Sequence, residues 1–355
     1  MKQKRILLIL FYLCSLIMNG SGTHAQQGFN TNHDLHDLEV KTIRLPENVF
    51  PRAVQPLSDN LVCLTFLGSP TLAFFDTSRV RFSARLTLPR EARLLVTDPD
   101  RKKLVVVTDS KPTLIVINVD SHKVELTAIL PSGSTPAGVV LDERHHVAYI
   151  GDGSQPVLYV MDTKTGIVTN HLRLSGYVEK MAFDQESQSL YVATTKAGSE
   201  DNASPASAVD VIDLVGLRLS SSIALPQAGA QGLVVAESGK SLIVLSSDQA
   251  MLMRVALGGR GQKPVVSIIK RVPEDWQADY PMGRDLAYDQ GSDNLYVECE
   301  DANTTWLCLL SGLTLTLKSK INISGSALVL GQSLPLRASK LYFIAKHQLV
   351  VVKPG

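Results

Sequence analysis

The sequence predicts an all-β protein, a seven-bladed β-propeller with four antiparallel strands in each blade. One pattern of short apolar runs recurs seven times along the 355 residues, at spacings of roughly 42 to 55 residues. Periods of about 40–45 residues with four strands per repeat are typical of propeller blades. The final copy also lacks one strand, which the N-terminal part of the chain can supply.

Each copy contains four runs in the same order. The first ends near an aspartate, the second is of the type "LYV", the third follows a turn and is of the type "VxVID", and the fourth alternates polar and apolar residues. Short apolar runs bounded by turn residues are typical of strands. The third run reads TLAFFDT (71–77), TLIVINV (113–119), VLYVMDT (157–163), AVDVIDL (208–214), MLMRVAL (251–257), WLCLLSG (306–312) and QLVVVKP (348–354).

The two ends of the repeat array complement each other. No residues for a fourth strand follow the last third-type run, whereas VKTIRLP (40–46) precedes the first complete blade and resembles the fourth-type run VELTAILP (124–131). Pairing of these ends would close the ring and leave neither edge with unpaired ladder groups. We therefore expect one domain over residues 38–355, with the N-terminal strand completing the seventh blade.

The repeats also resemble a known family. Copies such as TPAGVVLDERHHVAYIGDGSQPVLYVMDTKTGIVTNHLRL look like the YVTN-repeat, YncE-like family of bacterial secreted propellers. The resemblance covers nearly all of the chain after the leader, and it is weakest in blades 5 and 6, where the third-strand aspartate is absent. It implies a fold and not a function, because propellers carry many unrelated functions. In MDTKTG, the aspartate, threonine and glycine have the pattern of a turn between the third and fourth strands.

Residues 1–25 have the pattern of a secretory signal peptide. Basic residues precede an apolar run over 6–18, and small or polar residues follow it up to Ala25. As a helix this run would be about 20 Å long, short of the roughly 30 Å hydrocarbon core, so a membrane span is the weaker interpretation. We expect export to the periplasm or the medium, cleavage after Ala25, a polar leader over 26–37, and no transmembrane segment in the mature chain.

Charge and cysteine content exclude several functional classes. The formal net charge of +1 becomes −2 without residues 1–25, which hold three basic residues and no acidic ones. This balance lacks the electrostatic footprint of a nucleic-acid binder. The cysteines form no CxxC, haem-attachment or zinc-type group, so we expect no metal and no other cofactor. We expect a monomer.

Candidate binding residues come from the innermost strand of each blade, which lines the central channel. Charge concentrates at the start of this strand, near the loops that enter it from the preceding blade. The predicted channel-mouth residues are Arg52, Arg93, Glu179, Lys180, Gln231, Arg284 and Asp285. The three guanidinium groups could bind a carboxylate or phosphate, and the alternative is a hydrated channel whose charges pair with one another.

Two insertions fall on the same predicted face as these arginines. Blade 4 carries AGSEDNASPA (197–206), and blade 6 carries EDWQADYPMG (274–283), which holds Trp276 and Tyr280. Aromatic side chains beside a charged mouth suit sugar rings, planar ligands or a protein surface. The alternative is a loop whose aromatic side chains only cap the ring.

Cys299 and Cys308 lie in adjacent predicted strands of blade 6. A hairpin could place them side by side, so a disulfide is possible in an oxidising compartment. Two unlinked, partly buried thiols are the alternative.

The sequence favours an exported, non-catalytic binding or scaffolding protein. It has a rigid repeat scaffold with asymmetric insertions, and it contains no recognisable nucleophile elbow, zinc-protease motif or phosphate-binding loop. Its partner would be an unidentified small anion or a protein. The alternatives are a lactonase-like hydrolase, a non-redox propeller subunit of a periplasmic oxidoreductase, or a purely structural envelope protein.

Overall fold

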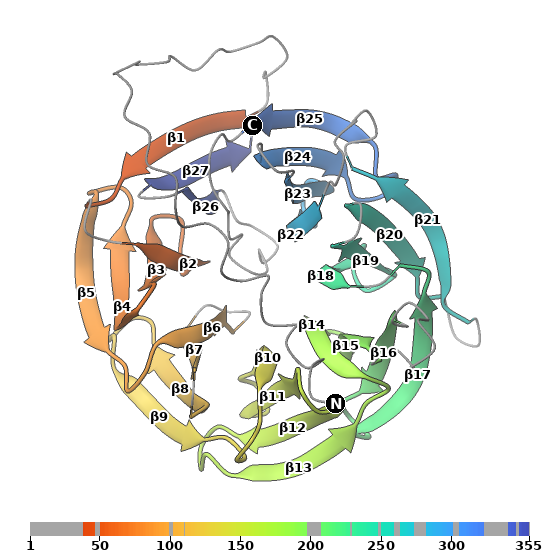
Figure 1. The fold of residues 1–355 in the computed structure, drawn as a ribbon, viewed down its shortest axis with the longest axis horizontal. Helices are drawn as coiled ribbons and strands as arrows, with labels where there is room; N and C mark the ends of the chain where they lie inside the picture. The colour runs from red at the N-terminus through yellow and green to blue at the C-terminus, as the bar shows by residue number, and fades with distance from the viewer. Residues whose placement is uncertain are drawn as a thin grey trace, which may run out of the picture. The chain divides into compact units, whose positions relative to one another are not determined.

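The computed structural model confirms the seven-bladed propeller (Figure 1). It describes residues 38–46, 50–98, 102–109, 111–196, 207–227, 229–247, 250–258, 263–272, 282–300, 305–322, 340–345 and 348–354, all within one compact unit, His36–Gly355. These residues contain strands and turns but no helix. Six sheets have four strands each, and the described part of the seventh has three, in the order β1-β27-β26.

The strands follow one another around the ring in chain order, and each blade runs from the channel to the rim. Blade 1 consists of β2 (Pro51–Pro56), β3 (Leu61–Phe66), β4 (Ser69–Asp76) and β5 (Arg81–Thr87). Blade 2 consists of β6 (Ala92–Thr97), β7 (Lys103–Thr108), β8 (Thr113–Asn118) and β9 (Val124–Ile129). Blade 3 consists of β10 (Pro136–Asp142), β11 (Val147–Asp152), β12 (Val157–Asp162) and β13 (Val168–Arg173). Blade 4 consists of β14 (Tyr177–Asp184), β15 (Ser189–Thr195), β16 (Ser207–Asp213) and β17 (Arg218–Leu225). Blade 5 consists of β18 (Ala230–Ala236), β19 (Ser241–Ser246), β20 (Met251–Ala256) and β21 (Val265–Arg271). Blade 6 consists of β22 (Met282–Asp289), β23 (Asn294–Glu300), β24 (Thr305–Ser311) and β25 (Leu317–Asn322). Blade 7 combines β26 (Leu341–Ala345) and β27 (Gln348–Pro354) with β1 (Leu38–Arg44).

The ring closes as the sequence predicts. Strand β1 pairs antiparallel with β27 over its whole length, from Leu38 opposite Pro354 to Arg44 opposite Gln348. The N-terminal strand therefore forms the outer edge of the last blade, next to the C-terminal strand (Figure 1). This arrangement pairs the edge of β27 that would otherwise carry free backbone groups.

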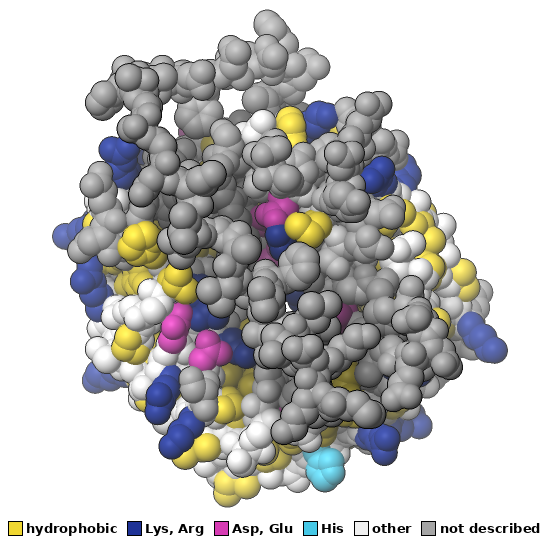
Figure 2. Space-filling model, in the orientation of Figure 1, with side chains coloured by type: hydrophobic (Ala, Val, Ile, Leu, Met, Phe, Trp, Pro, Cys, Tyr) yellow, Lys and Arg dark blue, Asp and Glu magenta, His cyan; other side chains and the backbone are white. Residues whose placement is uncertain are grey.

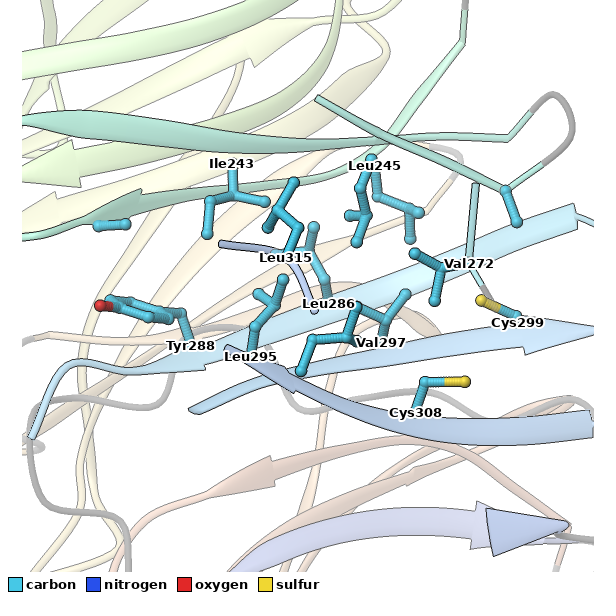
Figure 3. Close-up of a cluster of buried hydrophobic side chains, with 14 residues drawn as sticks. Ile243, Leu245, Val272, Leu286, Tyr288, Leu295, Val297, Cys299, Cys308 and Leu315 are labelled. Atoms are coloured by element: carbon cyan, nitrogen blue, oxygen red, sulfur yellow. The ribbon is translucent and has the colours of Figure 1, made fainter. Parts of the chain in front are cut away.

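The core lies between neighbouring blades. Between blades 5 and 6, for example, Leu245 and Leu252 pack in one buried cluster with Leu286 and Val297 (Figure 3). Both faces of each sheet are covered in this way, so the middle strands are almost wholly buried, as in β19. The outer strands are half exposed, and their burial alternates residue by residue, as in β5. This difference explains why the second and third runs are continuously apolar whereas the fourth alternates.

The MDTKTG segment forms the turn that its composition predicts. The Asp162 Oδ1 atom accepts hydrogen bonds from the Lys164 and Thr165 backbone N–H groups, each at 2.8 Å, and these bonds lower the pKa of the carboxyl group. Gly166 adopts a φ of +73°, a conformation that glycine accepts without steric cost. Asp76 and Asp213 accept the same bonds in blades 1 and 4. The recurring aspartate is thus a turn-forming residue.

Candidate functional site

Every described inner strand, from β2 to β22, carries a register shift at the same place. The inner residues that the ladder skips are Arg52, Arg93, Ala137, Glu179, Gln231 and Arg284. The residue after each skipped one rejoins the ladder, as Lys180 and Asp285 do in blades 4 and 6. In blade 1 this residue is Ala53. Blade 1 has Leu57 at the end of its inner strand, where blades 2, 3, 4 and 6 have an aspartate.

The predicted arginines are paired with carboxylates. The Arg52 Nη1 atom lies 2.7 Å from Glu91 Oε1 and 3.3 Å from Asp109 Oδ2, and Arg93 Nη1 lies 3.6 Å from Asp109 Oδ1. Figure 2 shows acidic side chains next to basic ones near the inner ends of blades 1 and 2. Two guanidinium charges thus face two carboxylate charges, which leaves little net positive charge to attract an anion.

The third arginine has its own partner within blade 6. Arg284 pairs with Glu300. These carboxylates were not among the predicted residues because none of them lies at the start of an inner strand. Glu91 precedes an inner strand, whereas Asp109 and Glu300 lie at the ends of second strands, which the fold brings to the same side of the ring.

Glu179 links two blades. Its Oε2 atom accepts a 2.7 Å hydrogen bond from the Ala230 backbone N–H of blade 5. A carboxylate that accepts a backbone donor from the next inner strand stabilises the contact between the blades. The neighbouring predicted residue, Gln231, is partly buried in that strand.

Lys180 and Asp285 line a cavity in the channel, which we call the axial cavity. Its volume is about 450 Å³, within the range of small-molecule sites. Its walls come from the inner strands of blades 2 to 6 and the turns that follow them, and they are mostly apolar. The lining includes Val96, Val139, Leu141, Met181, Ala182, Phe183, Leu233, Val235, Leu286 and Tyr288.

Asp285 is a buried charged group of the cavity wall, with 9% of its surface exposed. Its Oδ1 atom accepts a 2.9 Å hydrogen bond from the Leu286 backbone N–H. Burial raises the pKa of this carboxyl to about 6, although the positive charge of Lys180 and the backbone donor act in the opposite direction. Glu298, which is fully buried, lies directly opposite Asp285 in the ladder.

The blade between those of Lys180 and Asp285 carries a glycine in its inner strand. Lys180 belongs to blade 4, Asp285 to blade 6, and Gly232 to the intervening blade 5. A Cβ atom on Gly232 would lie 2.5 Å from Leu286 Cγ, so any larger residue would force Leu286 to shift. The glycine therefore allows the close approach of the strands that carry the cavity wall.

The cavity opens at the turns between the first and second strands. The lining residues Arg144, Glu186 and Ser238 belong to these turns and are exposed. Asp98 and Asp184 lie beside them and fix the turns, because their Oδ1 atoms accept backbone hydrogen bonds of 2.6 and 3.0 Å. The predicted arginine mouth lies at the opposite ends of the inner strands, where those strands begin.

Trp276 and Tyr280 lie outside the described residues, as does the whole insertion 197–206. The structure adds Asp98, Arg144 and Glu186 to the candidate residues, because they line the axial cavity at the end where it opens. Asp98 and Asp184 are two of the aspartates near which the first run of each repeat ends. Their repeated position in the sequence was the signal that could have indicated this end of the cavity.

Cys299 and Cys308 are free thiols in the structure, so the possible disulfide is not present. In the ladder Cys299 lies opposite Trp306, and Cys308 lies opposite Val297, so the two cysteines are diagonal neighbours. Diagonal positions lie about 7–8 Å apart, beyond the usual Cα separation of a disulfide. Both side chains are buried in the cluster between blades 5 and 6 (Figure 3). The hydrogen bond between the two thiols, together with burial, raises the pKa of Cys299.

Within the described part of the chain, no three His, Cys, Asp or Glu side chains gather in a way that could hold a metal ion. Nor does that part contain a helix long and apolar enough to cross a membrane.

Comparisons with known proteins show the fold. No family model matches the sequence, and no curated protein matches it. Among solved structures, the chain is similar to hydrazine synthase of Kuenenia stuttgartiensis, with a TM-score of 0.69 and 14% sequence identity over 87% of this chain and 96% of that one. In total 1611 chains of solved structures match, so the similarity identifies an architecture that hosts many functions.

Proposed function

We propose that this protein is an exported, non-catalytic propeller that binds a small ligand in the axial cavity. The observation that carries the proposal is the cavity itself, about 450 Å³ in volume and mostly apolar, with Lys180 and Asp285 in its wall. Binding sites commonly combine an apolar enclosure with a few polar groups that fix the ligand's orientation. The resemblance of the repeats to YVTN-type secreted propellers and the signal-peptide pattern support export.

The ion pairs favour this cavity over the arginine mouth as the binding site. An anion at Arg52 or Arg284 would have to compete with Glu91, Asp109 and Glu300, which are already in contact with the guanidinium groups. Lys180, in contrast, lines a cavity that has space for a ligand. An anion-specific rise in melting temperature that disappears in the double variant Arg52→Ala/Arg284→Ala would favour the arginine mouth instead.

The test uses an apolar fluorescent probe, N-phenylnaphthylamine, whose emission increases in apolar surroundings. The variant Gln185→Trp places an indole at the cavity mouth. Its backbone carbonyl can still accept the hydrogen bond that the Gln188 side-chain Nε2 donates across the turn. The control variant Gln155→Trp adds the same indole at an exposed position that is not part of the cavity lining.

We expect saturable binding of the probe to the wild type and to Gln155→Trp, and binding at least about tenfold weaker in Gln185→Trp. Equal binding by all three proteins would show that the probe binds elsewhere and would contradict the proposal. Absence of binding to the wild type would contradict it as well.

A second candidate is an enzyme, and one observation favours it. Asp285 is a buried carboxyl group with a pKa of about 6 beside a lysine charge, and perturbed carboxyls in cavities are often catalytic acids or bases. A lactonase-like hydrolase would turn over members of a lactone panel and lose this activity in Asp285→Asn. The alternative of a propeller subunit of an oxidoreductase has support only from the shared fold with hydrazine synthase at 14% identity.

A further inference from the structure

The two ends of the axial cavity differ in charge. At the inner end, where β14 begins, Lys180 carries a positive charge beside the carboxyl group of Asp285. The two charges nearly cancel when Asp285 is ionised, and the positive charge of Lys180 remains when Asp285 is protonated. At the mouth, three carboxylates line the cavity with one guanidinium. These mouth residues are Asp98, Asp184, Glu186 and Arg144. In a cleft with low-dielectric walls such a charge pattern orients a bound molecule.

The distance between the two ends follows from a single strand. Lys180 and Asp184 both belong to β14, four residues apart, and a strand rises about 3.3 Å per residue. The two charged levels are therefore separated by about 13 Å along the channel. A ligand that contacts both levels must be elongated.

The walls between the two levels are apolar. On β14 itself the intervening residues are Met181, Ala182 and Phe183, and Leu233 and Val235 lie at similar levels on β18. A polar middle section would lose hydration here without gaining hydrogen-bond partners from these side chains. A hydrocarbon middle section would instead gain from burial.

We infer, on the basis of the proposed binding function, that the axial cavity takes an elongated ligand with a carboxylate at one end, an apolar middle, and an ammonium group at the other. The carboxylate lies at Lys180, and the ammonium group lies among the carboxylates of the mouth. Asp285 is nearby as a buried carboxyl that holds its proton more readily than an exposed one. In its protonated form it donates a hydrogen bond to the ligand carboxylate.

The test compares three probe molecules of equal chain length by titration calorimetry. These are ω-aminooctanoate, octanoate and octylamine. We expect ω-aminooctanoate to bind at least about fivefold more tightly than either of the others, since only it pairs with both charged levels. Competition with N-phenylnaphthylamine then shows whether each probe occupies the cavity.

Three variants locate the ends of the ligand. Lys180→Met keeps the approximate length of the side chain and removes its charge. We expect this variant to bind ω-aminooctanoate and octanoate about tenfold more weakly than the wild type, and to bind octylamine equally well. The exposed Lys164, in a turn of blade 3, provides the control Lys164→Met, which should change nothing. Glu186→Gln should bind ω-aminooctanoate and octylamine about threefold more weakly than the wild type and bind octanoate equally well. The effect is modest because the Glu186 side chain is exposed.

The third variant, Asp285→Asn, distinguishes the two orientations of the ligand. With the carboxylate at the inner end, loss of a nearby negative charge and gain of an amide donor should tighten octanoate binding. If instead Asp285→Asn weakens octylamine, the ammonium group lies at the inner end and the inference is wrong.

Equal affinity for the three probes would contradict the inference while leaving the proposed function intact, because the cavity would then bind any apolar chain. If none of the three probes binds and N-phenylnaphthylamine fails as well, the proposed function itself is wrong.

Discussion

The replacement of Asp285 by asparagine should stabilise the folded protein at neutral pH. The pKa of this carboxyl is raised from 3.8 to about 6, so the folded state binds a proton more tightly than the unfolded state does. Two units of pKa correspond to about 3 kcal/mol as an order of magnitude. The wild type loses this free energy of unfolding as the pH rises from about 4 to above 6, whereas the asparagine variant does not.

Asparagine preserves the other features of the site. It has almost the same size, and its Oδ1 atom can still accept the hydrogen bond from the Leu286 backbone N–H. The difference in stability between Asp285→Asn and the wild type should therefore be about 3 kcal/mol near pH 7.5 and close to zero near pH 4.

Urea denaturation at a series of pH values between these limits measures the difference. The control is Asp59→Asn, at an exposed position in a turn of blade 1, which should show no comparable pH-dependent gain. A variant that is less stable than the wild type at pH 7.5, or a difference that does not vary with pH, would refute the reasoning. Either result would mean that Lys180 compensates the buried charge in full.

Three further predictions concern turns and thiols. Val80, half exposed, has a φ of +52°, so Val80→Asn should raise the stability by about 1 kcal/mol, visible as a higher melting temperature. Gly166→Ala should lower it by about 1–2 kcal/mol, because Gly166 also has a positive φ and an added Cβ would lie 2.9 Å from a neighbouring methyl group; an unchanged melting temperature would contradict this. Cys299 and Cys308 should both react with a thiol reagent only after unfolding under non-reducing conditions, and a chain mass lower by two hydrogens would show a disulfide instead.

The fold could be predicted from the sequence because its determinants are local and repeated. The turn aspartates, exemplified by Asp162, accept bonds from residues two and three positions later, so the repeat is visible in a single chain. The closure by β1 was also predictable, since the strand pattern at one end of the array lacks what the other end supplies.

The candidate site could be predicted only in part, because its chemistry depends on contacts between blades. The sequence identifies Arg52 as an inner-strand residue, but its partners Glu91 and Asp109 lie 39 and 57 residues further along the chain. No spacing rule connects them. The pairing of the arginines, which weakens the anion hypothesis, thus became visible only in three dimensions.

The axial cavity was hidden for a different reason. Lys180 and Asp285 were both predicted as channel-mouth residues, and both line the cavity. The free space near them depends on where small residues such as Gly232 allow neighbouring strands to approach, and on which end of the channel the side chains leave open. Those properties follow from packing between blades, which a strand pattern does not encode.

The most direct test of the central claim is a crystal of the protein soaked with ω-bromooctanoate, whose bromine can be located by anomalous scattering. The account predicts one bromine peak inside the axial cavity, between the inner strands of blades 2 to 6 and towards the turns that hold Glu186, with the carboxylate density at Lys180. Bromine peaks confined to the arginine mouth or to the outer rim of the blades would contradict it.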